Sequence, residues 1–265
     1  MRSQRAGAVP QTAAHVATAV LGVTLLACSG SPANTTPQSS TQYGSTVAVG
    51  NGTARSYLVT ENGKPTELGV ALSQGALDSL PATPKMGGYE YLVPLPATNP
   101  TQFQVIGLNW NPTGHPPAMI YTVPHFDVHF YMISLQEKNA IDPSDPAFGA
   151  DAANLPAAPF RAANYVNDPP ANVVPHMGLH WTDSTAAEFH GQPFTRTLIN
   201  GSWNGQFTFI EPMVARAYLL TNPDDLIPVV PASQHSIAGY YPSAYRVSWN
   251  AANAEWRVAL AQLQQ

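Results

Sequence analysis

The sequence predicts a mainly β protein, either an antiparallel β-sandwich resembling a jelly roll or an open barrel, with one or two short helices and long loops. Three observations favour this class. Several stretches alternate apolar and polar residues, as half-buried strands do. Proline is abundant, at 26 of 265 residues, or roughly twice its usual share. Charged residues make up only 10%, against the usual ~25%.

Eight or nine strands are expected along the chain. The first two form a hairpin through the turn Asn62-Gly63, because Asn-Gly suits a tight two-residue turn. The predicted strands cover residues 54–61, 66–72, 89–95, 102–110 and 121–134, two or three segments within 193–220, and 244–250.

Two helices and one long loop complete the prediction. Ser73 is a suitable N-cap for a short helix that ends before Pro81. Residues 251–265 predict a C-terminal helix, with Trp256, Val258, Leu260 and Leu263 on its packed face. Residues 136–172 are rich in Pro, Ala, Asp and Asn and indicate a long ordered loop. Such loops in small domains are often functional.

Residues 1–27 have the pattern of a secretory signal peptide. Two arginines precede a 12-residue apolar run, Val16–Ala27, which is too short for a permanent membrane span. Leu25-Leu26-Ala27-Cys28 resembles the lipobox of bacterial lipoproteins, in which the cysteine is acylated after cleavage. The alternative is an ordinary signal peptide with an incidental cysteine. Cys28 is the sole cysteine, so disulfides and thiolate metal sites are excluded.

The expected mature protein is a lipid-anchored, extracytoplasmic protein of the cell envelope. Residues 28–50, rich in Ser, Thr and Pro, predict a flexible tether, and residues 51–265 a single β-rich domain. Loss of residues 1–27 leaves nine basic against 16 acidic residues, a net charge of −7. Without a basic run, nucleic acid is not an expected partner. The lipid on Cys28 is the only membrane attachment expected.

Histidines are the main chemical signal. Apart from His15 there are seven, of which six lie between residues 115 and 190. In the strand at 121–134, alternation puts His125, Asp127 and His129 on one face with Tyr131. Phe126, Val128, Phe130 and Met132 face the other way, which predicts that their side is the core.

These residues predict a site for Zn, Fe or Mn with ligands from several strands. Further candidates are His176 and His180 around Gly178, and Glu211 beside Phe207 and Phe209. Residues i and i+4 of a strand are ~13 Å apart, so His125 and His129 cannot share an ion on a straight strand. Either Asp127 joins one of them, or a bulge bends the strand. Asp127 could also orient an imidazole from outside the coordination sphere.

A non-functional interpretation remains for each of these residues. Two histidines on one strand face can arise by chance, and Asp127 could pair with Arg196 or Arg216. His115 is expected to be a loop residue, and His190 and His235 to be structural or solvated. His125-Phe126-Asp127, with His235 and Arg246-Val247-Ser248, resembles part of the oxoglutarate-dependent oxygenase pattern. The spacing to His235 is about twice that family's usual gap.

The order of several segments resembles an uncharacterised bacterial secreted family with a proposed metal-binding site. The most specific segments are PHFDVHFY, residues 124–131, and MGLHW, residues 177–181. The resemblance covers roughly residue 54 to the C-terminus. It implies a β-rich extracytoplasmic domain, with homo-oligomer formation as one option and the histidines as ligands. It supplies no reaction.

Three functions follow from these observations. The first is a metal-binding domain without catalysis. The second is a metal-dependent hydrolase, lyase or oxygenase acting on a small envelope substrate through a metal-activated water. The third is a metal-free adhesion or assembly module, in which His125, His129 and His180 lie far apart.

Overall fold

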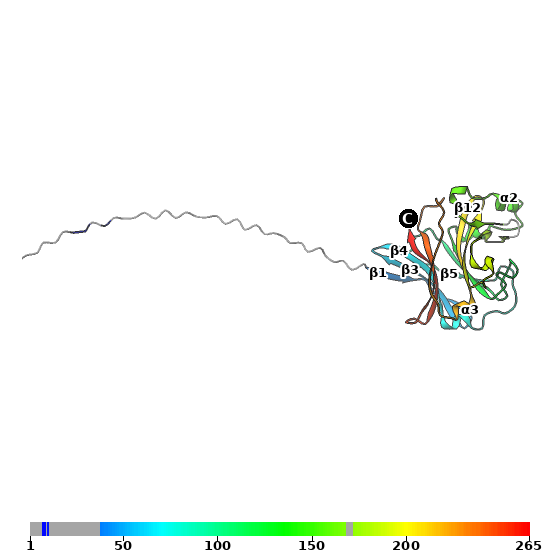
Figure 1. The fold of residues 1–265 in the computed structure, drawn as a ribbon, viewed down its shortest axis with the longest axis horizontal. Helices are drawn as coiled ribbons and strands as arrows, with labels where there is room; N and C mark the ends of the chain where they lie inside the picture. The colour runs from blue at the N-terminus through cyan, green and yellow to red at the C-terminus, as the bar shows by residue number, and fades with distance from the viewer. Residues whose placement is uncertain (1–6, 9, 11–37, 168–171) are drawn as a thin grey trace, which may run out of the picture. The chain divides into compact units, whose positions relative to one another are not determined.

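Two antiparallel sheets pack face to face, which confirms the predicted sandwich (Figure 1). The computed structural model describes residues 7, 8, 10, 38–167 and 172–265. Cys28 and almost all of the predicted signal peptide lie outside this part of the chain. Within it, no helix is long and apolar enough to cross a membrane.

The first sheet has seven strands in the order β1-β3-β4-β15-β14-β13, with β2 also paired to β3. Its strands are β1 Ser39–Tyr43, β2 Val47–Val49, β3 Gly52–Glu61, β4 Lys64–Ser73, β13 Asp224–Pro228, β14 Tyr241–Asn250 and β15 Glu255–Gln264. Asn62 and Gly63 join β3 to β4 with positive φ angles of 51° and 78°, as the expected hairpin turn requires.

The second sheet has eight strands in the order β5-β6-β7-β12-β11-β10-β8, with β9 also paired to β10. Its strands are β5 Tyr89–Val93, β6 Val105–Asn111, β7 His125–Tyr131, β8 Tyr165–Val166, β9 Val173–Val174, β10 Gly178–Asp183, β11 Arg196–Trp203 and β12 Gln206–Ala215. β7 and β12 occupy its centre.

The helices are short and lie between strands. They are α1 Leu135–Asn139, α2 Phe148–Ala153 and α3 Arg216–Leu219, with 3-10 turns η1 Gln74–Leu77, η2 Ala158–Phe160 and η3 Ala187–His190. The predicted helix after Ser73 is thus only the turn η1. The Ser73 hydroxyl does not cap it and instead accepts a hydrogen bond from the Thr53 amide at 2.8 Å.

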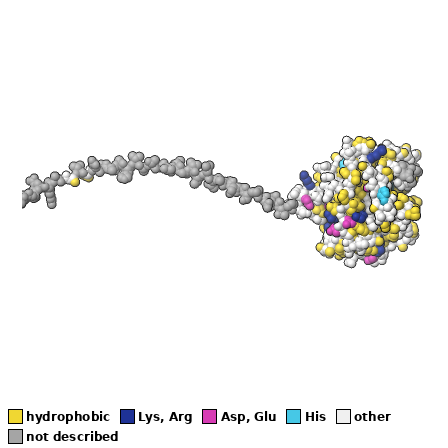
Figure 2. All heavy atoms as spheres, viewed as in Figure 1, with side chains coloured by type: hydrophobic (Ala, Val, Ile, Leu, Met, Phe, Trp, Pro, Cys, Tyr) yellow, Lys and Arg dark blue, Asp and Glu magenta, His cyan; other side chains and the backbone are white. Residues whose placement is uncertain are grey.

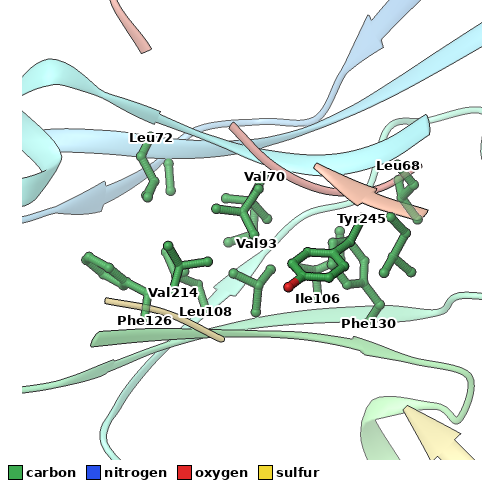
Figure 3. Packing of buried hydrophobic residues seen from close by; sticks show 14 of the residues in the cluster. Leu68, Val70, Leu72, Val93, Ile106, Leu108, Phe126, Phe130, Val214 and Tyr245 are labelled. Atoms are coloured by element: carbon green, nitrogen blue, oxygen red, sulfur yellow. The ribbon is translucent and has the colours of Figure 1, made fainter. Parts of the chain in front are cut away.

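The main core fills the space between the sheets (Figure 3). Leu68, Val70 and Leu72 of β4 face Ile106 and Leu108 of β6 across it. Phe126, Val128, Phe130 and Met132 also belong to this core, which confirms the face assigned to them from alternation.

The other face of the second sheet is also covered. Tyr121 and Phe194, from the segments before β7 and β11, pack on Ile199, Met213 and Ala215 of β11 and β12. Every residue of β7 is therefore buried. Polar side chains on this face lie in a second interior, away from bulk water.

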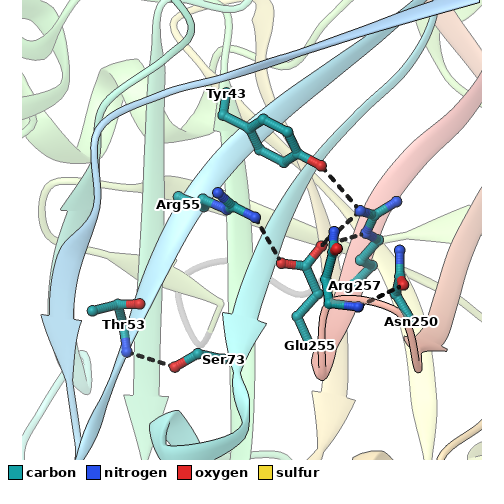
Figure 4. Close-up of polar contacts among 8 residues, drawn as sticks. Tyr43, Thr53, Arg55, Ser73, Asn250, Glu255 and Arg257 are labelled. Atoms are coloured by element: carbon teal, nitrogen blue, oxygen red, sulfur yellow. Dashed lines mark hydrogen bonds and ion pairs between the residues drawn. The ribbon is translucent and has the colours of Figure 1, made fainter.

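Residues 39–49 were assigned to the tether, and this was wrong, because they form β1 and β2 on the edge of the first sheet. Tyr43 lies 3.9 Å beneath the Arg55 guanidinium, and its hydroxyl accepts a hydrogen bond from Arg257 (Figure 4). Val49 is 1% exposed. Pairing with β3 overrides the loop-like composition of this segment.

The predicted C-terminal helix was also wrong, since residues 255–264 form strand β15 between β4 and β14. Trp256, Val258 and Leu260 recur with period two and face the core. The Ala- and Gln-rich composition favours a helix locally, but two neighbouring strands offer hydrogen bonds along the whole segment. Tertiary pairing decides the structure here.

Charged side chains are few on the surface. On the face shown in Figure 2, basic and acidic side chains intermingle among apolar ones. The ion pairs of the first sheet follow this pattern, with Glu255 between Arg55 and Arg257 and Glu67 beside Arg246.

Gly201 of β11 lies beneath the ring of Phe209, which crosses it from β12. A β-carbon at this position would lie only 1.8 Å from a ring atom of Phe209. The Asn200-Gly201 pair is thus not a turn, whereas Asn204-Gly205 joins β11 to β12. The glycine makes room for an aromatic ring over a central strand.

We expect Gly201→Ala to reduce the free energy of unfolding by about 1–3 kcal/mol, because Phe209 must move within a packed interior. Urea denaturation measures this. Gly149→Ala in α2 is the control, since a β-carbon there meets no atom within 4 Å, and alanine favours a helix. Equal stability of wild type and Gly201→Ala would contradict the close approach.

Candidate metal centre

The polar residues of β7 contribute to two separate groups of candidate ligands. The closed triad is His129, His180 and Glu211, and the open triad is His115, His125 and Asp127. In each triad, one ligand atom from each residue lies within 4.8 Å of the others. His125 and His129 stand four residues apart on a regular strand, so Asp127 joins the first and Glu211 the second.

Strand register builds the closed triad. The pairing of Phe130 with Ile210 and of Asp127 with Met213 puts Glu211 opposite His129. His180 comes from β10, beyond the intervening strand β11, where it pairs with Gly201. Phe209 contacts the imidazoles of both histidines, with ring centroids 5.0 and 5.1 Å away.

The donor atoms of the closed triad face one another without hydrogen bonds. The Oε2 atom of Glu211 lies 3.4 Å from Nε2 of His129 and 3.6 Å from Nε2 of His180. His129 Nε2 and Glu211 Oε2 are buried and have no hydrogen-bond partner. Nδ1 of His180 lies 3.1 Å from the carbonyl of Asn172. A carbonyl only accepts, so Nδ1 carries the proton, and Nε2 of the neutral ring presents a lone pair.

Burial keeps the two imidazoles of the closed triad neutral. It lowers the pKa of His129 to about 3 and that of His180 to about 4. Burial also raises the pKa of Glu211 well above its usual range, and the charge of Asp127 adds to this. Without a cation the site therefore favours neutral forms of all three groups.

The open triad joins β7 to the loop before it. The loop folds back so that the His115 amide donates to the Tyr121 carbonyl at 3.1 Å. Asp127 then lies between two imidazoles, with Oδ1 3.1 Å from Nε2 of His125 and Oδ2 3.6 Å from Nε2 of His115. Oδ2 also accepts a hydrogen bond from Asn111 at 2.6 Å.

The electrostatics of the open triad differ from those of the closed one. Burial alone would raise the pKa of Asp127, but the adjacent imidazoles of His125 and His115 outweigh it and hold the pKa well below its usual range. Asp127 is thus an anion in the folded protein. The pKa of His115 is raised, because Asp127 outweighs the effect of burial.

The other sequence candidates lie elsewhere. His176, predicted as a ligand, belongs to neither triad, and its Nδ1 faces the carbonyl of Asn139 at 3.1 Å. His235 stacks on Tyr241 and does not join His125 and Asp127, as an oxygenase site would require. Arg196 and Arg216 pair with Asp225 and Asp78 rather than with Asp127.

His115 is the triad member that the sequence-based reasoning missed. It is a loop residue as predicted, but the loop returns it to β7. The ring centroids of His115 and His125 are 4.7 Å apart. A signal was present, because glycine and two prolines around His115 indicate a rigid loop directly before the His-rich strand.

Residues 60–110 match the model of the TTHB210-like family, described as hypothetical protein TTHB210. The match runs from the end of β3 into β6 and includes no residue of either triad. Over this segment the chain is similar to an uncharacterised family, which is the part of the expected resemblance that the match supports. No curated protein and no solved structure matches the chain significantly.

The low pKa of His180 predicts a pH-dependent stability in the metal-free chain. An unfolded histidine has a pKa of about 6.5, against about 4 in the folded state. Between these values the unfolded state binds more protons, so stability falls as the pH is lowered. From pH 6.5 to 4.5 we expect His180 to account for a loss of about 2 kcal/mol.

Urea denaturation at both pH values, with a chelator present, compares wild type with His180→Gln. The wild type should lose more stability than the variant by about this amount. Glu211 titrates in both proteins, so its contribution largely cancels. Equal losses in the two proteins would show that His180 is protonated in the folded state.

Proposed function

We propose that this chain binds a divalent transition metal, Zn, Fe or Mn, through His129, His180 and Glu211. The observation that carries the proposal is the convergence of buried nitrogen and oxygen atoms that have no hydrogen-bond partner. Leaving one such atom unsatisfied costs about 1–3 kcal/mol, and the closed triad has several. A cation bound by both Nε2 atoms and by Oε2 would satisfy them together.

The metal-free alternatives fit the geometry less well. An ion pair needs a protonated imidazole, but burial holds the pKa values of His129 and His180 at about 3 and 4. A protonated Glu211 could donate to one histidine. The separations of 3.4 and 3.6 Å are long for such a bond, and only one imidazole could receive it. The ring centroids of His129 and His180 are 6.2 Å apart. This disfavours the metal-free assembly module, in which these histidines would lie far apart.

Two imidazoles and a carboxylate are a ligand set used by zinc enzymes and by non-haem iron proteins. In the closed triad, His129 and Glu211 are almost fully buried and His180 is 14% exposed. Access from solvent is thus narrow. This enclosure favours a permanently bound metal and disfavours a metal that contacts a large substrate. Metal binding without assigned catalysis is therefore the function supported best.

The metal content of the purified full-length chain tests the proposal. After reloading with Zn²⁺, elemental analysis should show that His129→Ala/His180→Ala binds one equivalent less than wild type. If the double variant folds poorly, Glu211→Gln replaces it, because this substitution preserves the shape of the side chain. Glu211→Gln should also bind one equivalent of zinc less than wild type. His235→Ala is the matched control and should bind as wild type does. Equal zinc in wild type and both triad variants would overturn the proposal.

We further propose that acylated Cys28 anchors the chain to the bacterial envelope, facing outward from the cytoplasm. The support is the position of the lone cysteine directly after an apolar run and Leu-Leu-Ala. In a bacterial host, the wild type should fractionate with membranes and incorporate labelled palmitate. Cys28→Ser should do neither, because the acceptor thiol is lost. Palmitate labelling of Cys28→Ser would contradict this anchor.

A further inference from the structure

We propose that the open triad is a second, independent transition-metal site whose remaining coordination position is open to solvent. Metal binding at the open triad does not require a metal in the closed triad, since the two triads share no ligand. The backbone positions of His125 and His129 are four residues, or ~13 Å, apart along the strand. This spacing and the separate ligand sets disfavour a dinuclear centre, whose ions lie ~3.5–4 Å apart.

Backbone carbonyls fix both imidazoles of the open triad in a metal-binding tautomer. Nδ1 of His125 lies 2.7 Å from the Val123 carbonyl, and Nδ1 of His115 lies 2.7 Å from that of Pro116. Because carbonyls only accept, each Nδ1 holds a proton, so the neutral form of each ring has its lone pair on Nε2. Ligating histidines in metal sites are oriented in this way.

In that neutral form, both Nε2 lone pairs lie beside the carboxylate of Asp127, which has no proton to donate. His125 Nε2 and Asp127 Oδ1 are 3.1 Å apart, yet they form no hydrogen bond, and both atoms are buried without another partner. His125 is fully buried and Asp127 nearly so. A cation between the Nε2 atoms and the carboxylate accounts for the arrangement. Asn111 then orients Asp127 from outside the coordination sphere.

The open position follows from the exposure of His115. Its side chain is 34% exposed, whereas His125 is fully enclosed. Three protein ligands leave a tetrahedral ion with one free position. Aromatic rings line the protein side, with Tyr121 against His115 and Phe194 against His125. The ligand class that fits is water or a small anion, exchangeable from the solvent side.

Cobalt(II) is the probe, because its visible absorption reports both binding and coordination. Metal-stripped full-length chain is titrated with Co²⁺, and bound equivalents are measured by equilibrium dialysis. Wild type should bind two equivalents, His115→Gln one and Glu211→Gln one. The combined variant should bind none. His190→Gln is the matched control, since His190, the last residue of η3, also has a ring nitrogen facing a backbone carbonyl, and it should bind two.

Azide then tests the open position. In Glu211→Gln, which keeps only the open triad, azide should change the cobalt spectrum by displacing bound water. In His115→Gln, which keeps only the closed triad, it should change little. If Glu211→Gln folds poorly, judged by circular dichroism, His180→Ala replaces it.

The outcomes separate the two proposals. Loss of cobalt only in Glu211→Gln would overturn the second site and leave the closed triad intact. Loss only in His115→Gln would overturn the closed triad and leave the second site. A Glu211→Gln spectrum that does not respond to azide would overturn the open coordination position.

Discussion

The structure depends on the burial of strand β7 on both faces. One face packs in the core between the sheets, and the other is covered by loops that carry Tyr121 and Phe194. An edge or half-exposed strand could leave its polar side chains in water. Here His125, Asp127 and His129 must find partners inside the protein, because burying polar groups unpaired is costly.

The protein meets this constraint with two clusters rather than one network. Each cluster joins a carboxylate to two imidazoles, and the imidazoles with a backbone partner hold a proton on Nδ1. In each cluster, buried nitrogen and oxygen atoms face one another without a hydrogen-bond partner. A bound cation would contact these atoms together, whereas protons can satisfy only part of them. The same physical argument therefore supports both proposed sites.

The two triads differ in enclosure, and enclosure sets what each metal could do. Around the closed triad, neighbouring strands and Phe209 leave little access to solvent. The open triad takes one ligand from a loop, so one side of its ion would face water. Gly201 contributes to this enclosure, since its missing side chain leaves room for the Phe209 ring, which contacts both His129 and His180.

The sequence by itself determined the β class, the first hairpin, the core face of β7 and five of the six triad residues. Period-two alternation and Asn-Gly turns are local signals. Alternation indicates which face of a strand a side chain occupies, and an Asn-Gly pair indicates where a hairpin turns. Only the tertiary structure decided that residues 255–264 form a strand, that residues 39–49 join a sheet, and that the ligands divide into two groups. These outcomes depend on pairing between distant segments. The position of His115 beside His125 also depends on a contact between distant segments, because the loop must fold back onto β7. The residue pattern of a single strand carries no information about which distant segments it will contact.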